Sequence, residues 1–210
     1  APTKSGVIGL LAAALGIRRD APERLTPLNQ LRFGVRTDRA GSLLVDFHTA
    51  GKLTPLQKKQ KLKETPYITR RHYLADAVFL VGLESTDRAL LEQLADALQS
   101  PAYPLFLGRR SCPPTLPLCL GIREIDLVES LRSEPALASA AQLGSEKSVC
   151  ILLDADPLEP NAFPQRDLPL SFDPRHRRFG YRAVKELRFS PQEPVSSTTQ
   201  HDPFAELGGA

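Results

Sequence analysis

The sequence predicts an α+β fold, because strand-like segments follow one another between two helical ones. Residues 3–15 form an apolar segment long enough for a helix. Three strand-like segments follow at residues 31–36, 43–48 and 74–83. Residues 85–98 then place apolar side chains at helical spacing behind a Ser-Thr-Asp cap. The order helix, strand, strand, strand, helix is typical of α+β domains.

The first predicted helix has a polar start and an apolar surface. Thr3 or Ser5 can cap it, and Gly16 can end it. Its surface is apolar nearly all round, which predicts burial. Lys4 and Ser5 stand at the N-terminus, where free N–H groups and the helix dipole favour anions. The pair either seats a phosphate or belongs to a capped packing helix, and the glycines of a P-loop are absent.

The strand predictions depend on alternation and on turn residues. Residues 31–36 alternate as in a half-buried strand, and the Asp-Arg-Ala-Gly sequence at 38–41 predicts a turn. The next two strands, 43–48 and 74–83, are apolar and can pair with each other. Such a pair would anchor the polar segment that lies between them.

This polar segment concentrates positive charge. Its aromatic residues Tyr67 and Tyr73, together with its cations, suit a polyanion that has exposed bases. The density of lysine keeps it out of any core, and a solvated loop without a ligand is the alternative. Against the single acid Glu64, the cations are Lys52, Lys58, Lys59, Lys61, Lys63, Arg70 and Arg71.

Residues 105–110 combine an apolar strand end with a turn. Gly108 is free to adopt a positive φ. Arg109 and Arg110, which follow it, can clamp a phosphate or pair with carboxylates. Ordinary solvated surface is the other interpretation of this arginine pair.

The rest of the chain contains fewer predicted elements. Residues 125–131 can form a short helix and 149–153 a buried strand, whereas 157–174 are Pro-rich and predicted to be irregular. Composition predicts a mobile insertion at 133–148 and a disordered tail at 191–210. A second basic patch, interleaved with Phe179, Tyr181 and Phe189, comprises Arg175, Arg177, Arg178, Arg182, Lys185 and Arg188.

Composition excludes several classes of protein. A hydrophobic content of 41% supports a core, but a net charge of only +3 means that nucleic-acid binding must depend on local patches. Three cysteines without a CxxC pair argue for a reducing compartment, such as the cytoplasm. Four histidines lack metal-binding spacing, so we expect no metal or cofactor. No apolar run reaches the ~20 residues that span a bilayer.

Several short motifs occur in a characteristic order. They are Pro-Thr-Lys-Ser-Gly at 2–6, Leu-Leu-Ala-Ala-Ala-Leu-Gly-Ile at 10–17, Arg-Asp at 19–20, Val-Arg-Thr-Asp at 35–38, Asp-Phe-His-Thr at 46–49, Thr-Arg-Arg-His-Tyr-Leu-Ala-Asp-Ala at 69–77 and Leu-Gly-Arg-Arg-Ser-Cys-Pro at 107–113. Together they resemble the CasD subunit family of the type I-E CRISPR surveillance complex, Cascade. The resemblance covers residues 2–122, with a weaker echo at 168–184.

The resemblance implies a ferredoxin-like, RRM-related fold with a thumb-like arm at about residues 49–72. It also implies a non-catalytic subunit that binds the 5′ handle of the CRISPR RNA, caps the backbone-subunit filament and contacts the large subunit. We therefore expect an RNA-binding domain at 1–122, an extension at 123–190 and a tail at 191–210. The expected RNA contacts are Lys4, Ser5, Lys52, Lys58, Lys59, Lys61, Lys63, Arg70, Arg71, Tyr73, Arg109 and Arg110, with a structural role for the last two left open.

The sequence departs from the family pattern at its start. Family members have a hydrophobic strand and a Gly/Pro-rich turn before the Pro-Thr-Lys/Arg-Ser-Gly motif, and the printed sequence has neither. In a ferredoxin-like sheet that strand is central. We therefore expect unpaired strand edges and a partly uncovered first helix.

An enzymatic alternative is an endoribonuclease that processes CRISPR repeats without a metal, as sister subunits of the type I-C branch do. His48, His72, Tyr67, Tyr73 and the lysines of the arm supply residue types suited to general acid–base catalysis. Packed or hydrogen-bonded roles are the alternative for each of them. A small-molecule enzyme lacks support, because the chain has no GxSxG, dinucleotide or metal motif.

Overall fold

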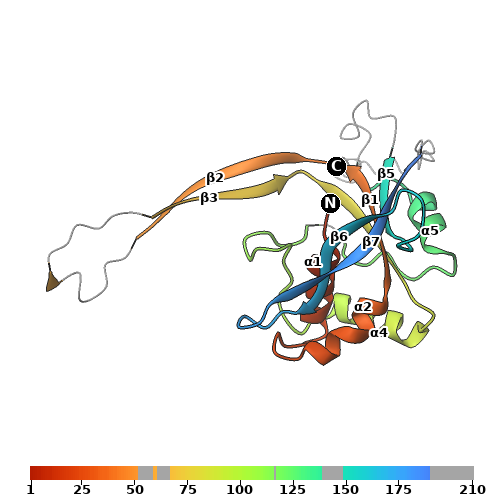
Figure 1. Cartoon of the computed structure of the whole chain (residues 1–210), viewed down its shortest axis with the longest axis horizontal. Helices are drawn as coiled ribbons and strands as arrows, with labels where there is room; N and C mark the ends of the chain where they lie inside the picture. The colour runs from red at the N-terminus through yellow and green to blue at the C-terminus, as the bar shows by residue number, and fades with distance from the viewer. Residues whose placement is uncertain (52–58, 61–66, 116, 139–148, 190–210) are drawn as a thin grey trace, which may run out of the picture.

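The computed structural model describes residues 1–51, 59–60, 67–115, 117–138 and 149–189 (Figure 1). In chain order the elements are α1 (Lys4–Ala14), η1 (Pro22–Leu25), α2 (Thr26–Gln30), β1 (Arg32–Arg39), β2 (Ser42–Ala50), β3 (Tyr67–Ala75), β4 (Val78–Glu84), α4 (Arg88–Gln99), α5 (Leu127–Ser133), β5 (Val149–Asp154), β6 (Phe163–Ser171) and β7 (Arg178–Phe189). The predicted tail 191–210 lies outside the described residues, as does most of the predicted insertion.

The body is built on a five-stranded antiparallel sheet with the order β4-β1-β5-β7-β6. The strands of the predicted extension, β5 to β7, join β1 and β4 in this sheet, so they complete it instead of forming a separate layer. The mixture of helices with an antiparallel sheet confirms the predicted α+β class.

Helices pack against both faces of the sheet. Leu83 of β4 packs with the core that α1, α2 and α4 form on one face. The adjacent Gly82 faces the other side, where a Cβ atom would lie 2.4 Å from Leu127 of α5. Gly34 in β1 makes similar room for Leu131. These two glycines therefore let α5 approach the sheet closely.

A buried arginine fixes the segment that follows α5. Arg36 of β1 pairs with Asp38 and donates hydrogen bonds to the carbonyl oxygens of Leu131 and Pro135. Asp38 also accepts a hydrogen bond from the backbone N–H of Leu137. The first residues of the predicted mobile insertion are therefore held to the sheet.

Three strand predictions were wrong. Residues 105–107, predicted to end a strand before the turn at Gly108, form no strand. The predicted strand 74–83 is divided at Asp76, which has a φ of 57°, so its first part belongs to β3 and its second to β4. The Pro-rich segment predicted to be irregular contains β6. Pro164 and Pro169 fit there because β6 is an edge strand, where a missing N–H can be tolerated.

The strands β2 and β3 form a separate two-stranded sheet, which we call the arm. It leaves the body between β1 and β4 and projects far beyond it (Figure 1). Among the described residues, β2 and β3 pair with each other from Ser42–Ala75 to Ala50–Tyr67. The arm lies where the thumb was predicted. It is longer than the predicted range 49–72, because β2 begins at Ser42 and β3 ends at Ala75.

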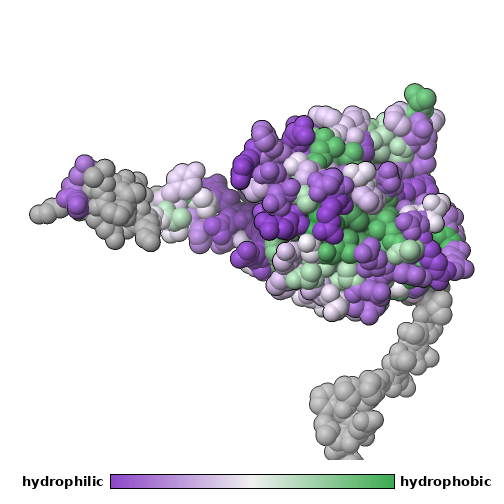
Figure 2. Space-filling model, turned by 90° about the horizontal axis from the view of Figure 1, so that it is seen from below, coloured by the Kyte–Doolittle hydropathy of each residue, from purple (hydrophilic) through white to green (hydrophobic). Residues whose placement is uncertain are grey.

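The outer edge of β4 pairs with no other described strand. Along it runs a groove of about 800 Å³, lined by Val7 and Leu10 of α1, Leu98 of α4 and residues 117–127. The expected unpaired strand edge is therefore present, and α1 lines the groove beside it. Figure 2 shows hydrophobic side chains exposed on the underside of the body, where Figure 1 places α1, α2 and α4.

Candidate nucleic-acid interface

The pairing register divides the arm into two chemically different faces. Directly opposed residues in an antiparallel pair lie on the same side of the sheet. Arg71 opposes Asp46, and Tyr73 opposes Leu44, which places both Arg71 and Tyr73 on one face. Arg70 lies on the other face, opposite Phe47. The two adjacent arginines therefore cannot contact the same stretch of ligand from one side.

The face that carries Arg70 is mainly apolar and open to solvent. Its large side chains are between 49% and 67% exposed, and β2 and β3 pack mainly against each other. A two-stranded hairpin alone is marginally stable in water, so such a face is normally covered by a partner. We call it the aliphatic face, and its apolar members are Leu43, Val45, Phe47, Ile68 and Leu74.

At the base of the opposite face, an arginine from a distant turn meets an aromatic ring. The guanidinium carbon of Arg109 lies 5.0 Å from the centre of the Tyr73 ring. Gly108, with a φ of 80°, forms the turn that presents Arg109. Arg71 lies two residues before Tyr73 on the same face, at a spacing of about 7 Å. We call Arg71, Tyr73 and Arg109 the arm-base cluster, in which two cations flank an aromatic ring.

The two histidines of the arm lie on opposite faces. His48 opposes Thr69, whereas His72 opposes Val45 on the aliphatic face. Pairing of the strands therefore does not bring the two imidazoles together as an acid–base pair. His72 also points away from Arg71, as the alternation in the sequence predicted.

The remaining predicted contacts of the arm are only partly described. Lys59 is exposed, and Arg110 is exposed beside Arg109. Four predicted lysine contacts lie outside the described residues, namely Lys52, Lys58, Lys61 and Lys63.

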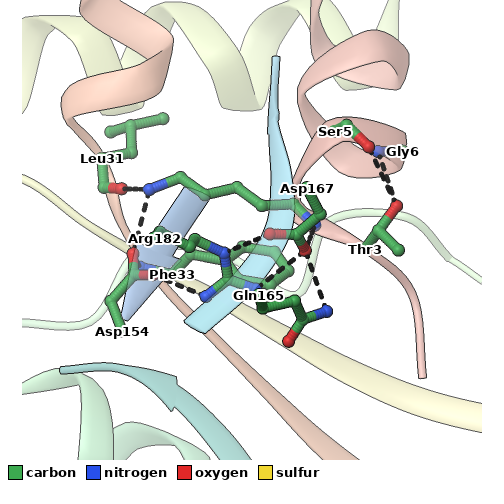
Figure 3. Close-up of polar contacts among 10 residues, drawn as sticks. Thr3, Ser5, Gly6, Leu31, Phe33, Asp154, Gln165, Asp167 and Arg182 are labelled. Carbon is green, nitrogen blue, oxygen red and sulfur yellow. Dashed lines mark hydrogen bonds and ion pairs between the residues drawn. The ribbon is translucent and has the colours of Figure 1, made fainter. Parts of the chain in front are cut away.

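The prediction that Lys4 contacts RNA conflicts with its surroundings. Its side chain is only 5% exposed, and its ammonium donates to the carbonyl oxygen of Leu31 at 2.7 Å. The same ammonium pairs with Asp154 at 2.9 Å (Figure 3). Thr3, and not Ser5, caps α1 by accepting from the N–H of Gly6. The helix start is therefore a packed structural element, in which Lys4 faces the interior.

A buried network holds Lys4 in place. Arg182 of β7 pairs with Asp154 and with Asp167, each at 2.6 Å, and Asp167 accepts the backbone N–H of Lys4 at 2.8 Å (Figure 3). Burial alone would lower the pKa of Arg182, but hydrogen bonds to Asp167 and Asp154 outweigh it and raise that pKa. No sequence motif indicated this network, because its members lie far apart along the chain.

Fold and surface together define a class of protein, an α+β domain with a ferredoxin-like sheet and a projecting β-hairpin arm. A sequence model of the family described as CRISPR-associated protein (Cas_Cas5) matches residues 1–185, so the chain belongs to this family. The predicted resemblance to CasD is also confirmed. The chain is 42% identical over 132 residues to the CRISPR system Cascade subunit CasD of Escherichia coli (strain K12). That match spans 57% of this chain and 58% of the length of the relative.

Two solved structures have the same fold. One, described as a crystal structure of a Cas protein, is 39% identical with a TM-score of 0.67, and the match covers 91% of this chain and 82% of the other. The second belongs to a CRISPR RNA-guided surveillance complex and is 32% identical with a TM-score of 0.72, covering 93% of this chain and 80% of the other. These likenesses confirm the predicted ferredoxin-like fold. None of the helices in the described ranges is long and apolar enough to cross a membrane.

Proposed function

We propose that this chain is the non-catalytic, RNA-binding and assembly subunit of a type I-E CRISPR surveillance complex in the cytoplasm. In this role it binds the 5′ handle of the CRISPR RNA, caps one end of the backbone-subunit filament and contacts the large subunit. The observation that carries the proposal is the arm-base cluster, because two cations beside a tyrosine ring match a strand with phosphates and unpaired bases.

The two faces of the arm support two different contacts. The face with Arg71 and Tyr73 offers charge and an aromatic ring, which suits RNA. The aliphatic face offers exposed hydrocarbon that phosphates would not cover, which suits a protein surface. We assign the first face to the handle and the second to a neighbouring subunit of the filament.

The placement of the histidines supports the non-catalytic assignment. Cleavage without a metal needs one group to deprotonate the 2′-hydroxyl and another to protonate the leaving oxygen. His48 and His72 stand on opposite faces of the arm, so one scissile phosphate cannot touch both. The endoribonuclease alternative would then need a different pair of groups.

The binding test uses the full chain and labelled repeat-derived RNA, with and without the handle sequence, in EDTA from pH 6 to 9. We expect a stable shift that requires the handle, and no cleavage. Arg71→Ala should weaken binding by ~1–3 kcal/mol if its contact is bidentate or stacked. Arg88→Ala is the control, because this arginine is exposed on the body and already pairs with Glu92. A discrete cut that disappears in His48→Ala or His72→Ala would establish the endoribonuclease alternative instead.

Assembly is tested separately by co-expression with the other Cascade subunits and a CRISPR array. We expect the chain to be recovered in a stoichiometric complex with RNA. Replacing Val45 and Phe47 on the aliphatic face with serine should release the chain from the backbone subunits, since both side chains are exposed and contribute little to its own core. Normal recovery of that variant would contradict the assignment of this face.

A further inference from the structure

The second basic patch of the sequence is divided by the fold into two groups of side chains. Arg182 and Arg188 form ion pairs with acids of the sheet, each at 2.6 Å, and Lys185 pairs at 2.5 Å with Glu159, which lies between β5 and β6. These three cations are neutralised inside or along the sheet. The arginines of the turn between β6 and β7, Arg175 and Arg177, form no ion pair with any described residue, and neither does Arg178 at the start of β7.

A fourth arginine and an exposed tyrosine lie on the same hairpin, on the face of β7 opposite to Arg178, so the unneutralised group surrounds the end of the hairpin. Tyr181 is 67% exposed, and the guanidinium carbon of Arg166 lies 5.9 Å from the centre of its ring. Arg166 is held there by a hydrogen bond from its Nε to the carbonyl oxygen of Phe179. One side of the Tyr181 ring therefore has a cation fixed beside it, while much of the ring remains open to solvent.

The turn that carries these arginines is well anchored. Asp173 accepts the backbone N–H of Arg175, and Ser171 accepts that of Asp173. Below the turn, Phe172 and Phe179 pack edge to face at 6.5 Å. Phe172 also packs against the core beneath α1. A fixed turn loses little conformational entropy when it binds a ligand, so a preorganised turn binds more tightly than a flexible charged loop would.

The pairing register places this surface far from the arm. Thr37, near the arm end of β1, is level with Cys150 of β5, and Cys150 is level with Arg188 of β7. Arg178 lies ten residues before Arg188 in the same strand, which is about 33 Å along an extended chain. Figure 1 likewise shows the turn between β6 and β7 and the arm leaving the body at different places. The two cationic surfaces are therefore separate.

We propose that this surface, the β6–β7 patch, is a second binding site for single-stranded nucleic acid. Its members are Arg166, Arg175, Arg177, Arg178 and Tyr181. The three arginines at the turn contact phosphates, and the exposed part of the Tyr181 ring stacks with one base, as sequence-tolerant single-strand sites do. The shared chemistry is a phosphodiester strand with an unpaired base, which either an RNA guide or a displaced DNA strand supplies. The inference does not depend on the arm-base cluster.

The test measures the affinity of the full chain for labelled single-stranded RNA and DNA of the same sequence and length, over a series of salt concentrations. Replacing Arg175, Arg177 and Arg178 with Gln should lower the salt slope by about 2, since each phosphate contact on a single strand contributes about 0.7. Three exposed arginines elsewhere, replaced together by Gln, remove the same charge and should leave the slope unchanged. These controls, each paired with an acid, are Arg18, Arg88 and Arg123.

A second pair of variants tests stacking. Tyr181→Ala should weaken binding about 5- to 150-fold, the range expected for loss of one stacked base, whereas Tyr181→Phe keeps the ring and should bind normally. An unchanged melting temperature for Tyr181→Ala would show that the loss is not due to unfolding. The same losses should appear in an Arg71→Ala background, because distant independent sites add.

The outcomes separate this site from the handle site. A loss of affinity and of salt slope for RNA, for DNA or for both supports the proposal and identifies which strand binds. Unchanged affinity and slope in both series would overturn it, and so would an effect equal to that of the control arginines. If the patch variants bind nucleic acid normally but lose a protein subunit from the assembled complex, the surface belongs to a protein partner and the proposal is wrong. None of these outcomes alters the result expected for the handle.

Discussion

Replacing Lys4 with methionine tests whether the start of α1 is a structural element or an RNA contact. Methionine keeps most of the side-chain volume and removes the ammonium. Breaking a buried ion pair costs about 3–5 kcal/mol. The loss should be smaller here, about 2–3 kcal/mol, because Asp154 keeps its bonds from Arg182 and from the Phe33 N–H while the Leu31 carbonyl loses a donor. For a chain of this size that corresponds to a fall of about 4–12 °C in melting temperature.

The assay compares thermal unfolding with the salt dependence of RNA binding. Lys4→Met should lower the melting temperature and leave the salt slope unchanged for the folded protein. Lys59→Met is the control for stability only, because this exposed lysine lies between β2 and β3 and its loss should change stability by less than ~0.5 kcal/mol. A slope reduced by about 0.7 with an unchanged melting temperature would refute the reasoning and make Lys4 a phosphate contact.

Three further predictions concern stability. Gly41→Ala should lower the free energy of unfolding by about 2 kcal/mol or more, because Gly41 has a φ of 75° and a Cβ atom would lie 2.5 Å from a backbone oxygen. Gly108→Ala has open space around it and should lower it by only ~1–2 kcal/mol, as measured by thermal unfolding. The hydrogen bond from Lys185 lowers the pKa of Glu159, so this pair stabilises the fold above the unfolded value of 4.5 and less as the pH falls through the folded pKa. The difference in melting temperature between the natural chain and Glu159→Gln should therefore shrink below pH 4.5. Fusing an apolar, strand-forming segment before Pro2 should raise the melting temperature and protect the backbone amides of β4 from hydrogen exchange. The reason is that the outer edge of β4 pairs with no described strand and a groove runs along it. Unchanged hydrogen exchange would show that the added segment does not pair with β4.

Local sequence patterns correctly predicted the elements whose structure depends on nearby residues alone. The apolar periodicity of α1 and α4 and the alternation of β1 are local properties, so those elements appear where expected. The division between β3 and β4 was not visible, because Asp76 adopts a left-handed conformation in a segment that is apolar on both sides. β6 was missed because prolines normally exclude a strand, and only its edge position in the folded sheet permits them.

Positive charge alone does not identify a nucleic-acid surface in this chain, because the fold decides which cations have acidic partners. Lys4 stands at a helix start that resembles an anion site, yet the carboxylate that pairs with it, Asp154, is 150 residues away. Arg182 and Arg178 belong to one basic run in the sequence, but Arg182 lies within the sheet beside Asp154 and Asp167, whereas Arg178 lies at the end of the strand. The same alternation separates Arg70 from Arg71 on the arm. A cation that already pairs with a buried acid is not free to bind a ligand, whereas Arg71 and Arg109 at the base of the arm, and the arginines at the turn between β6 and β7, form no ion pair with any described residue.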